Sequence, residues 1–259
     1  MIQSDQLLFD GSGGRRLSGV LDLPPKAPEG YGLMAHCFTG GKEHHATRRI
    51  SRALTDRGLA MLRFDFAGLG DSGGEFGTFS SNVDDIAHAA RYLTEHHGPP
   101  SLIIGHSLGG AAVLAAAADI DSLDAVVTIG APSDPSHVTH LFADAMADID
   151  AHGSGTVMLG GQQFTISNEY IEDLQDQQQR ERIAALGRPL LILHAPRDEV
   201  VGVDHARVIY EAARHPKSFV SLDGADHLLT KPRQAKRVAQ LVAAWADPYL
   251  PEEFTPEID

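Results

Sequence analysis

The chain has 259 residues, of which 42% are hydrophobic, so it can bury a large core as one domain with an insertion. Its 21 basic and 35 acidic residues give a formal net charge of −14, which argues against nucleic acid and anionic membrane surfaces as partners. The single cysteine, Cys37, excludes an internal disulfide, and neither a secretory signal nor a membrane-spanning run is evident, so we expect a cytoplasmic protein.

The first half of the chain predicts alternating strands and helices. Strands are expected at 6–10 and 17–23, with a glycine turn between them, and then at 31–35 and 60–66. Helices are expected at 44–57 and at 82–97, the second with Asn82 as its N-cap. A strand from Ser101 then leads into an alanine-rich helix that ends near Ala118, and a buried strand follows at 125–129.

The alternation stops in residues 135–188. A hairpin at 156–166 is expected to turn at Gly160-Gly161, and a glutamine-rich helix is expected at 168–186. The position of this segment indicates a lid over a site at the sheet edge. Its first part predicts an amphipathic helix whose apolar stripe comprises Val138, Leu141, Phe142, Ala145, Met146 and Ile149.

Strands at 189–194 and 218–222 and helices at 203–214 and 232–246 complete the pattern. Repeated strand and helix units imply an α/β fold with a mostly parallel central sheet and helices on both faces. We therefore assign residues 1–134 and 189–247 to the core, 135–188 to a lid insertion, and the proline-containing tail, 248–259, to a linker-like segment.

The junction Gly105-His-Ser-Leu-Gly109 is the strongest chemical signal. A strand that passes into a helix within so few residues bends sharply, and the central Ser107 is expected to be strained, exposed and nucleophilic. The N–H of Leu108 would lie at the helix N-terminus, where it can hold an oxyanion. Around Ser72 a second G-x-S-x-G occurs, and it overlaps a G-x-G-x-x-G, but no helix opens there, which disfavours both a nucleophile and a dinucleotide site.

A serine nucleophile needs a base and an acid that orients the base. In this fold class the chain order is serine, acid, histidine, which selects Asp198, after a buried strand, and His227, in a loop before the last helix. Asp134 also follows a buried strand and stays open as the acid, and Asp198 or Asp226 could instead cap turns.

The loop after the third strand normally supplies the second oxyanion donor, here the N–H of Phe38. Its neighbour Cys37 has no basic residue placed to form a thiolate, so a cysteine nucleophile is disfavoured. The pair His137 and His140 has no third ligand apparent, so we expect no metal and no cofactor.

These features resemble the serine α/β-hydrolases over nearly the whole chain. Four segments more narrowly resemble the hydrolase half of bacterial hydrolase–OsmC fusion proteins: 35–39, 79–83, 128–132 and 137–142. The resemblance implies an esterase with a small lid, although Cys37 replaces a glycine common in the oxyanion loop. Since no OsmC-type domain follows in this sequence, we expect either a stand-alone relative or an excised half whose proline-rich tail is a former linker.

We therefore expect a serine carboxylic-ester hydrolase that forms an acyl-enzyme on small-molecule esters of short to medium chain length. Thioesterase or perhydrolase activity on the same triad, and a non-catalytic binding module on this fold, are the alternatives. The sequence leaves open whether the chain forms a homo-oligomer.

Overall fold

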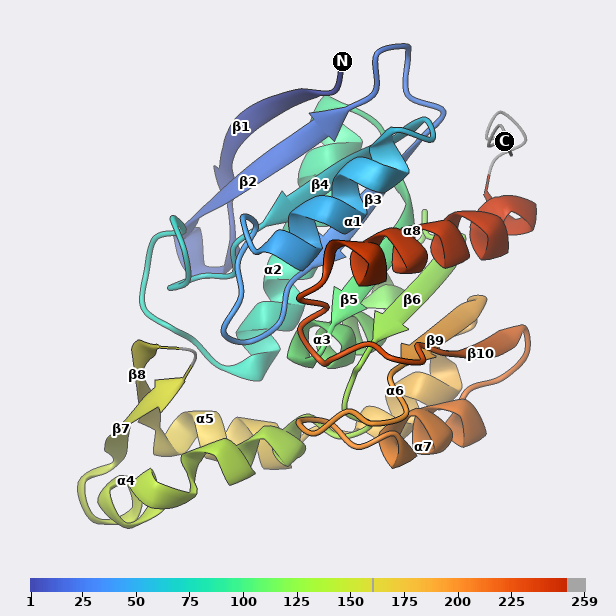
Figure 1. The fold of residues 1–259 in the computed structure, drawn as a ribbon. Helices are drawn as coiled ribbons and strands as arrows, with labels where there is room; N and C mark the ends of the chain where they lie inside the picture. The colour runs from blue at the N-terminus through green and yellow to red at the C-terminus, as the bar shows by residue number, and fades with distance from the viewer. Residues whose placement is uncertain (160, 251–259) are drawn as a thin grey trace.

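A computed structural model describes residues 1–159 and 161–250. Its centre is an eight-stranded sheet in the order β1-β2-β4-β3-β5-β6-β9-β10 (Figure 1). The strands of this sheet are β1 (Gln3–Asp10), β2 (Arg16–Leu23), β3 (Gly30–Ala35), β4 (Leu59–Phe64), β5 (Pro100–His106), β6 (Ala125–Ile129), β9 (Leu190–His194) and β10 (Lys217–Ser221). Only β2 runs antiparallel to its neighbours β1 and β4, and the other pairs are parallel, as the sequence predicts.

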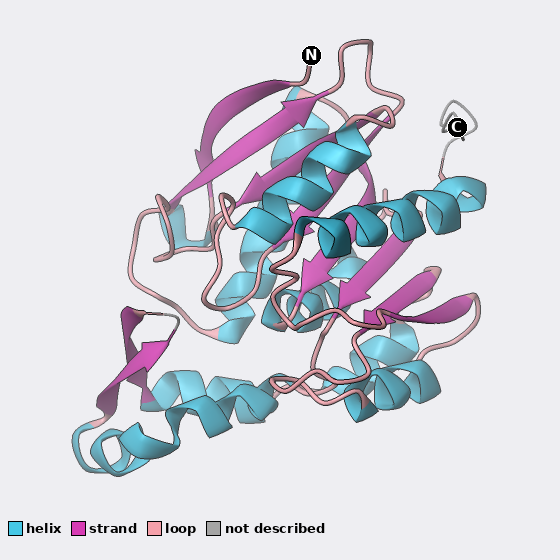
Figure 2. Ribbon diagram, viewed as in Figure 1, coloured by secondary structure: helices cyan, strands magenta, loops and turns pink. Residues whose placement is uncertain are grey.

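Helices cover both faces of the sheet (Figure 2). They are α1 (His45–Thr55) and α8 (Pro232–Ala246) on one face, and α2 (Phe79–His96), α3 (Leu108–Ala116) and α7 (Asp204–Ala212) on the other. Adjacent strand residues point to opposite faces: Ile103 of β5 packs in the core with α2 and α3, whereas Ile104 packs with α1 and α8. Both faces of the strands are therefore apolar, which explains why they form short continuous hydrophobic runs in the sequence.

The helix expected at 82–97 and the glutamine-rich helix both differ from the observed ones. Helix α2 begins at Phe79 rather than Asn82, and Thr78 caps it by accepting a hydrogen bond from the N–H of Ser81. Phe79 is fully buried, so the extra turn places a large apolar side chain in the core, and Asn82 lies inside the helix. The glutamine-rich helix is divided into α5 (Asn168–Gln175) and α6 (Gln179–Ala185).

The segment between β6 and β9 begins with a 3₁₀ helix (Pro135–Ala145) that continues into α4 (Met146–His152), where a single α-helix is expected from the apolar stripe. The strands β7 (Ser154–Leu159) and β8 (Gln162–Ser167) then form the expected hairpin, although Gly160 of its turn lies outside the described residues. Helix α6 packs against the core helices α3 and α7, and the lid boundary at residue 188 stays a prediction.

The end of the described chain differs in part from a linker. Residues Asp247–Tyr249 form a 3₁₀ turn after α8, and the side chain of Leu250 is buried in the core on the α8 face. The rest of the expected tail, 251–259, lies outside the described residues. Of the helices in residues 1–159 and 161–250, none combines the length and the apolarity that a membrane crossing requires.

Candidate active site

Ser107 lies at a sharp bend between β5 and α3. Its φ of 54° and ψ of −126° place a non-glycine residue in a strained region of backbone space. Glycine is required on both sides, because a Cβ on Gly105 would lie 2.4 Å from the carbonyl oxygen of Gly109, and a Cβ on Gly109 would lie 2.2 Å from that of His36. The local chain thus holds Ser107 in the conformation that the motif predicts.

The expected exposure of Ser107 is wrong, because only 8% of the residue is accessible. The loop between β10 and α8 lies over it, and Nε2 of His227 is 3.0 Å from the Ser107 Oγ. At the other side of the same imidazole ring, Nδ1 of His227 is 2.8 Å from Oδ2 of Asp198. Ser107, selected by its motif, and Asp198 and His227, selected by chain order, therefore form one continuous hydrogen-bonded chain, while their catalytic roles stay a prediction.

The Asp198 carboxylate uses its two oxygens for different tasks. Its Oδ1 accepts hydrogen bonds from the N–H groups of Val200 and Val201, both at 2.9 Å, which closes the turn after β9. Its Oδ2 faces two imidazoles, with His227 Nδ1 at 2.8 Å and His194 Nε2 farther away at 3.8 Å. Burial alone would raise the pKa of Asp198, but the hydrogen bonds from His227 and the backbone outweigh it and hold the pKa below its usual value. The acid is thus kept as a carboxylate beside the imidazole.

The other candidate acids have different partners. Asp134 caps the 3₁₀ helix at the start of the insertion, where its Oδ1 accepts from the N–H of Ser136 at 2.8 Å. Asp226 accepts from both the N–H and the hydroxyl of Thr230. Both carboxylates therefore stabilise local turns, and among the described residues Asp198 is the acid that contacts His227.

The predicted oxyanion donors come from two neighbouring segments. Leu108 is the first residue of α3, so its N–H has no carbonyl within the helix to receive it. Phe38 follows β3, and it lines a small cavity together with Leu108 and Gly109. The close contact between Gly109 and His36 joins the two segments, while the role of Phe38 and Leu108 as oxyanion donors stays a prediction.

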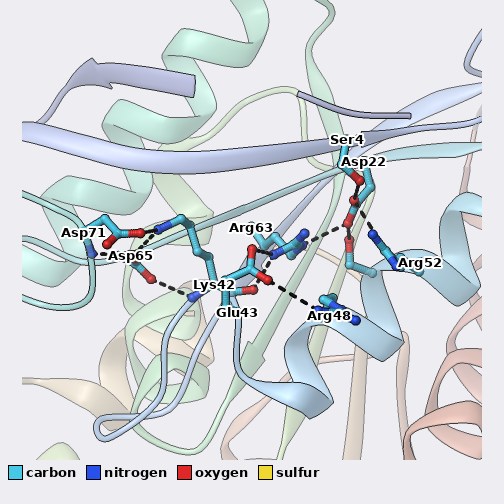
Figure 3. A network of polar contacts seen from close by, with 10 residues as sticks. Ser4, Asp22, Lys42, Glu43, Arg48, Arg52, Arg63, Asp65 and Asp71 are labelled. Carbon is cyan, nitrogen blue, oxygen red and sulfur yellow. Dashed lines mark hydrogen bonds and ion pairs between the residues drawn. The ribbon is translucent and has the colours of Figure 1, made fainter. Parts of the chain in front are cut away.

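A buried polar network holds the loop that carries Phe38 (Figure 3). Lys42 of this loop is inserted between Asp65 and Asp71, with its Nζ 2.6 Å from an oxygen of each, and its own N–H donates to Asp65. Burial would lower the pKa of the Lys42 ammonium, but its hydrogen bonds to the two carboxylates raise the pKa above its usual value. Arg63 of β4 donates to the Lys42 carbonyl at 2.6 Å, so both backbone groups of Lys42 have partners.

The same guanidinium reaches the first strands of the sheet. Arg63 Nε donates to Asp22 Oδ2 at 2.9 Å, and both side chains are almost completely buried. Asp22 also accepts hydrogen bonds from Ser4 and Ser51. Our sequence analysis missed this network, although Asp22 and Arg63 each lie between apolar residues of a strand, which is a signal that buried charges are paired.

An aromatic cluster joins the insertion to the core. Its members are Phe38, Phe76, Phe142, Phe164 and Tyr170. The Phe38 ring lies 5.0 Å from the ring of Phe76 and 5.3 Å from that of Phe164. The insertion therefore packs directly on the residue whose N–H is the predicted oxyanion donor.

Ser72 and Cys37, the two competing nucleophiles considered in the sequence analysis, lie in surroundings that do not activate them. Ser72 donates its hydroxyl to the Asp65 carbonyl at 2.6 Å and accepts from the N–H of Ser18, which ties its loop to β2. Cys37 is buried, and burial raises the pKa of its thiol to about 11, so the thiol is not ionised near neutral pH.

Gly130, which follows β6, is a site residue that our sequence analysis did not single out. Its φ is +55°, and a Cβ there would lie 3.3 Å from both Asp198 Oδ2 and His227 Nδ1. A side chain at this position would press on the hydrogen bond between the acid and the base. The available signal was a glycine directly after a buried strand, in the place where the chain must turn away.

Comparisons with known proteins show that the chain is similar to hydrolases. The family model described as "Serine aminopeptidase, S33" matches residues 34–152. The monoacylglycerol lipase of Mycolicibacterium smegmatis is 24% identical to this chain in an alignment 275 residues long. The alignment covers 93% of this chain and 96% of the lipase.

Solved structures resemble nearly the whole chain, and two of them are esterases by name. The esterase domain of a Rhodothermus marinus protein has a TM-score of 0.81 and 45% identity, covering 96% of this chain and 100% of that domain. Est1E from Butyrivibrio proteoclasticus, solved with ferulic acid bound, has a TM-score of 0.80 and 21% identity, covering 94% of this chain and 98% of Est1E.

Proposed function

This chain belongs to the α/β-hydrolase family, and from that premise we propose that it is a serine carboxylic-ester hydrolase that works through an acyl-enzyme. One observation carries the proposal: Ser107 Oγ, His227 and the Asp198 carboxylate are linked by contacts of 3.0 and 2.8 Å. A hydroxyl within reach of an imidazole that is itself oriented by a carboxylate is the arrangement that activates a serine.

In the first half of the reaction, Ser107 Oγ attacks the ester carbonyl carbon while Nε2 of His227 takes the hydroxyl proton. The negative charge on the carbonyl oxygen is held by the N–H groups of Phe38 and Leu108. The tetrahedral intermediate then collapses, the bond to the alkoxy oxygen breaks, and the alcohol leaves with the proton from His227. The acyl group remains on Ser107.

In the second half, a water molecule attacks the acyl carbon and gives a proton to His227. Collapse of this intermediate breaks the bond to Ser107 Oγ, which recovers its proton from the imidazolium. The carboxylic acid is released and the free enzyme is restored. Asp198 keeps His227 in the right tautomer and stabilises the imidazolium in both halves.

The insertion is proposed to limit the size of the acyl group. Three side chains of the insertion, Phe142, Phe164 and Tyr170, pack on the ring of Phe38 in the oxyanion loop. A small closed lid encloses a modest pocket, which suits short and medium acyl chains. The alternatives are thioesterase and perhydrolase activity. Both would proceed through the same acyl-enzyme, so activated thioesters are assayed as substrates and peracid is assayed as a product in the same test.

The proposal is tested by labelling with a fluorophosphonate and by turnover of p-nitrophenyl esters of graded chain length. The wild type is expected to be labelled on Ser107 and to hydrolyse the shorter esters, and Ser107→Ala should lose both properties. Ser72→Ala, in the second G-x-S-x-G, is the matched control and should keep both. A wild-type protein that is neither labelled nor active would instead indicate a binding module on this fold.

We further propose that the chain is related to the hydrolase half of hydrolase–OsmC fusion proteins. In support, a structure 45% identical over almost the whole chain is called an esterase domain. The test is the genome of the source organism: an OsmC-type coding region adjoining that of this chain would support the relation, and its absence would count against it.

A further inference from the structure

Two strands of the central sheet end in buried histidines. His106 is the last residue of β5, and His194 is the last residue of β9. These strands flank β6 in the sheet (Figure 1), and both side chains are completely buried. Neither histidine belongs to the triad of Ser107, His227 and Asp198.

His106 contacts the loop that carries the proposed base. Its Nε2 lies 2.7 Å from the backbone carbonyl oxygen of His227, and the two imidazole rings are 5.4 Å apart. The residue that precedes Ser107 in the chain therefore holds the backbone of the residue that activates Ser107. A single side chain connects the elbow to a loop 121 positions later.

His194 makes the equivalent contact with the loop of the acid. Its Nε2 lies 2.7 Å from the carbonyl oxygen of Val201. The N–H of Val201 in turn donates to Asp198 Oδ1 at 2.9 Å. His194 thus anchors the peptide segment that orients the Asp198 carboxylate toward His227.

The hydrogen bonds define the protonation state of both histidines. A carbonyl oxygen can only accept, so Nε2 carries the hydrogen in each ring. Each Nδ1 is buried and has no partner in the described part of the chain, so a proton there would be left without an acceptor. Burial also lowers the pKa of His106 to about 3 and lowers that of His194. Both rings therefore stay neutral donors while His227 exchanges its proton.

We propose that His106 and His194 are positioning residues of this site, each holding in place the loop of one triad member through a hydrogen bond from Nε2 to a backbone carbonyl. This inference rests on the proposed hydrolase function. On this proposal, the histidines at the ends of β5 and β9, the strands on either side of β6, keep the base and the acid aligned. These bonds matter because the loops themselves lie partly at the surface, where Val200 and Leu228 are exposed.

The test compares removal of each donor with its replacement. In His106→Leu and His194→Leu the donor is lost, whereas in His106→Gln and His194→Gln the amide nitrogen lies the same number of bonds from Cα as the imidazole Nε2. We expect each Leu variant to lower kcat about 10- to 100-fold with KM within about threefold, since a misplacement near 1 Å has effects of this size. Each Gln variant should recover most of the loss.

All rates are expressed per active site, counted by fluorophosphonate titration, so misfolded protein does not enter kcat. The labelling rate of Ser107 should fall in parallel with kcat in the Leu variants, because labelling also needs an aligned His227. Thr128→Val is the matched control, since Thr128 is a fully buried residue of β6 whose hydroxyl has no partner among the described residues. It should keep wild-type kcat.

Leu variants with unchanged kcat per active site, or Gln variants as impaired as the Leu variants, would overturn the inference. A purely structural role would lower Tm and the titrated fraction while leaving those rates intact. Failure of the proposed function is recognised separately, because the wild type itself would then be neither labelled nor active.

Discussion

The Nδ1 atom of His227 lies 2.8 Å from Oδ2 of Asp198, which comes 29 positions earlier in the chain. The second oxygen of the same carboxylate, Oδ1, accepts hydrogen bonds from two backbone N–H groups of its own turn. The carboxylate group therefore cannot rotate freely. Asp134, which also follows a buried strand, instead caps the first turn of the insertion. The choice between the two acids thus depends on one interresidue contact.

Substitution of the two acids should separate their roles. Asp198→Asn is expected to lower kcat by about 10⁴, because an amide cannot hold the correct tautomer of His227 or stabilise its imidazolium. Asp134→Asn should cost tenfold or less, as a change at a helix cap near the surface. The measurement is kcat for a short-chain ester, with circular dichroism to verify folding. The opposite ranking would move the acid to Asp134.

The aromatic cluster predicts a change in acyl-chain preference. Phe164→Ala removes a buried ring beside Phe38 and should raise the ratio of kcat/KM for decanoate to that for butyrate esters, because the space under the insertion grows. Met158→Ala is the matched control in the same hairpin, since Met158 is 64% exposed, and it should leave the ratio unchanged.

The stability of Phe164→Ala is measured as well, because loss of a buried ring lowers the free energy of unfolding by about 3–5 kcal/mol. The comparison is therefore made below the Tm of the variant. A wild type that hydrolyses emulsified long-chain esters faster than short ones would contradict a size limit set by the insertion.

The Cys37 thiol should be inert in the folded protein. With a pKa raised to about 11 by burial, it is protonated until the pH approaches that value, and only about one thiol in a thousand is ionised at pH 8. Iodoacetamide at pH 8 should react slowly with native protein and quickly after unfolding in guanidinium, as followed by mass spectrometry. Cys37→Ala should keep kcat within a few-fold. Rapid alkylation of native protein with loss of activity would revive a cysteine nucleophile.

The buried pair of Arg63 and Asp22 should matter far more than an exposed pair. Arg63→Met removes the cation 2.9 Å from the buried Asp22 carboxylate and leaves it only the half-exposed Arg52 at 4.0 Å, so the free energy of unfolding in urea is expected to fall by about 3–5 kcal/mol. Arg16→Met breaks the exposed pair with Asp10 and should change it by about 1 kcal/mol or less. Similar losses for the two variants would show that the network contributes little.

Several features of this protein are determined by residues close together in the chain. The strand, the glycine-flanked bend and the helix around Ser107 occupy fewer than twenty consecutive residues, so their pattern predicts the elbow directly. The alternation of apolar strands and amphipathic helices likewise predicts a mostly parallel sheet, and α8 is found over the range expected, Pro232–Ala246. The order of acid and base along the chain selected Asp198 and His227, which the structure brings into contact.

The tertiary structure alone decided how distant segments meet. Ser107 is buried rather than exposed because a loop 120 positions away covers it, and His106 reaches the His227 carbonyl across a similar separation. The pairing of Asp22 with Arg63 depends on β2 lying beside β4, a neighbour relation that no local pattern encodes. Hydrophobic periodicity reports which face of an element is apolar, whereas a hydrogen bond between side chains requires the strand order and the loop paths that place two particular atoms about 3 Å apart.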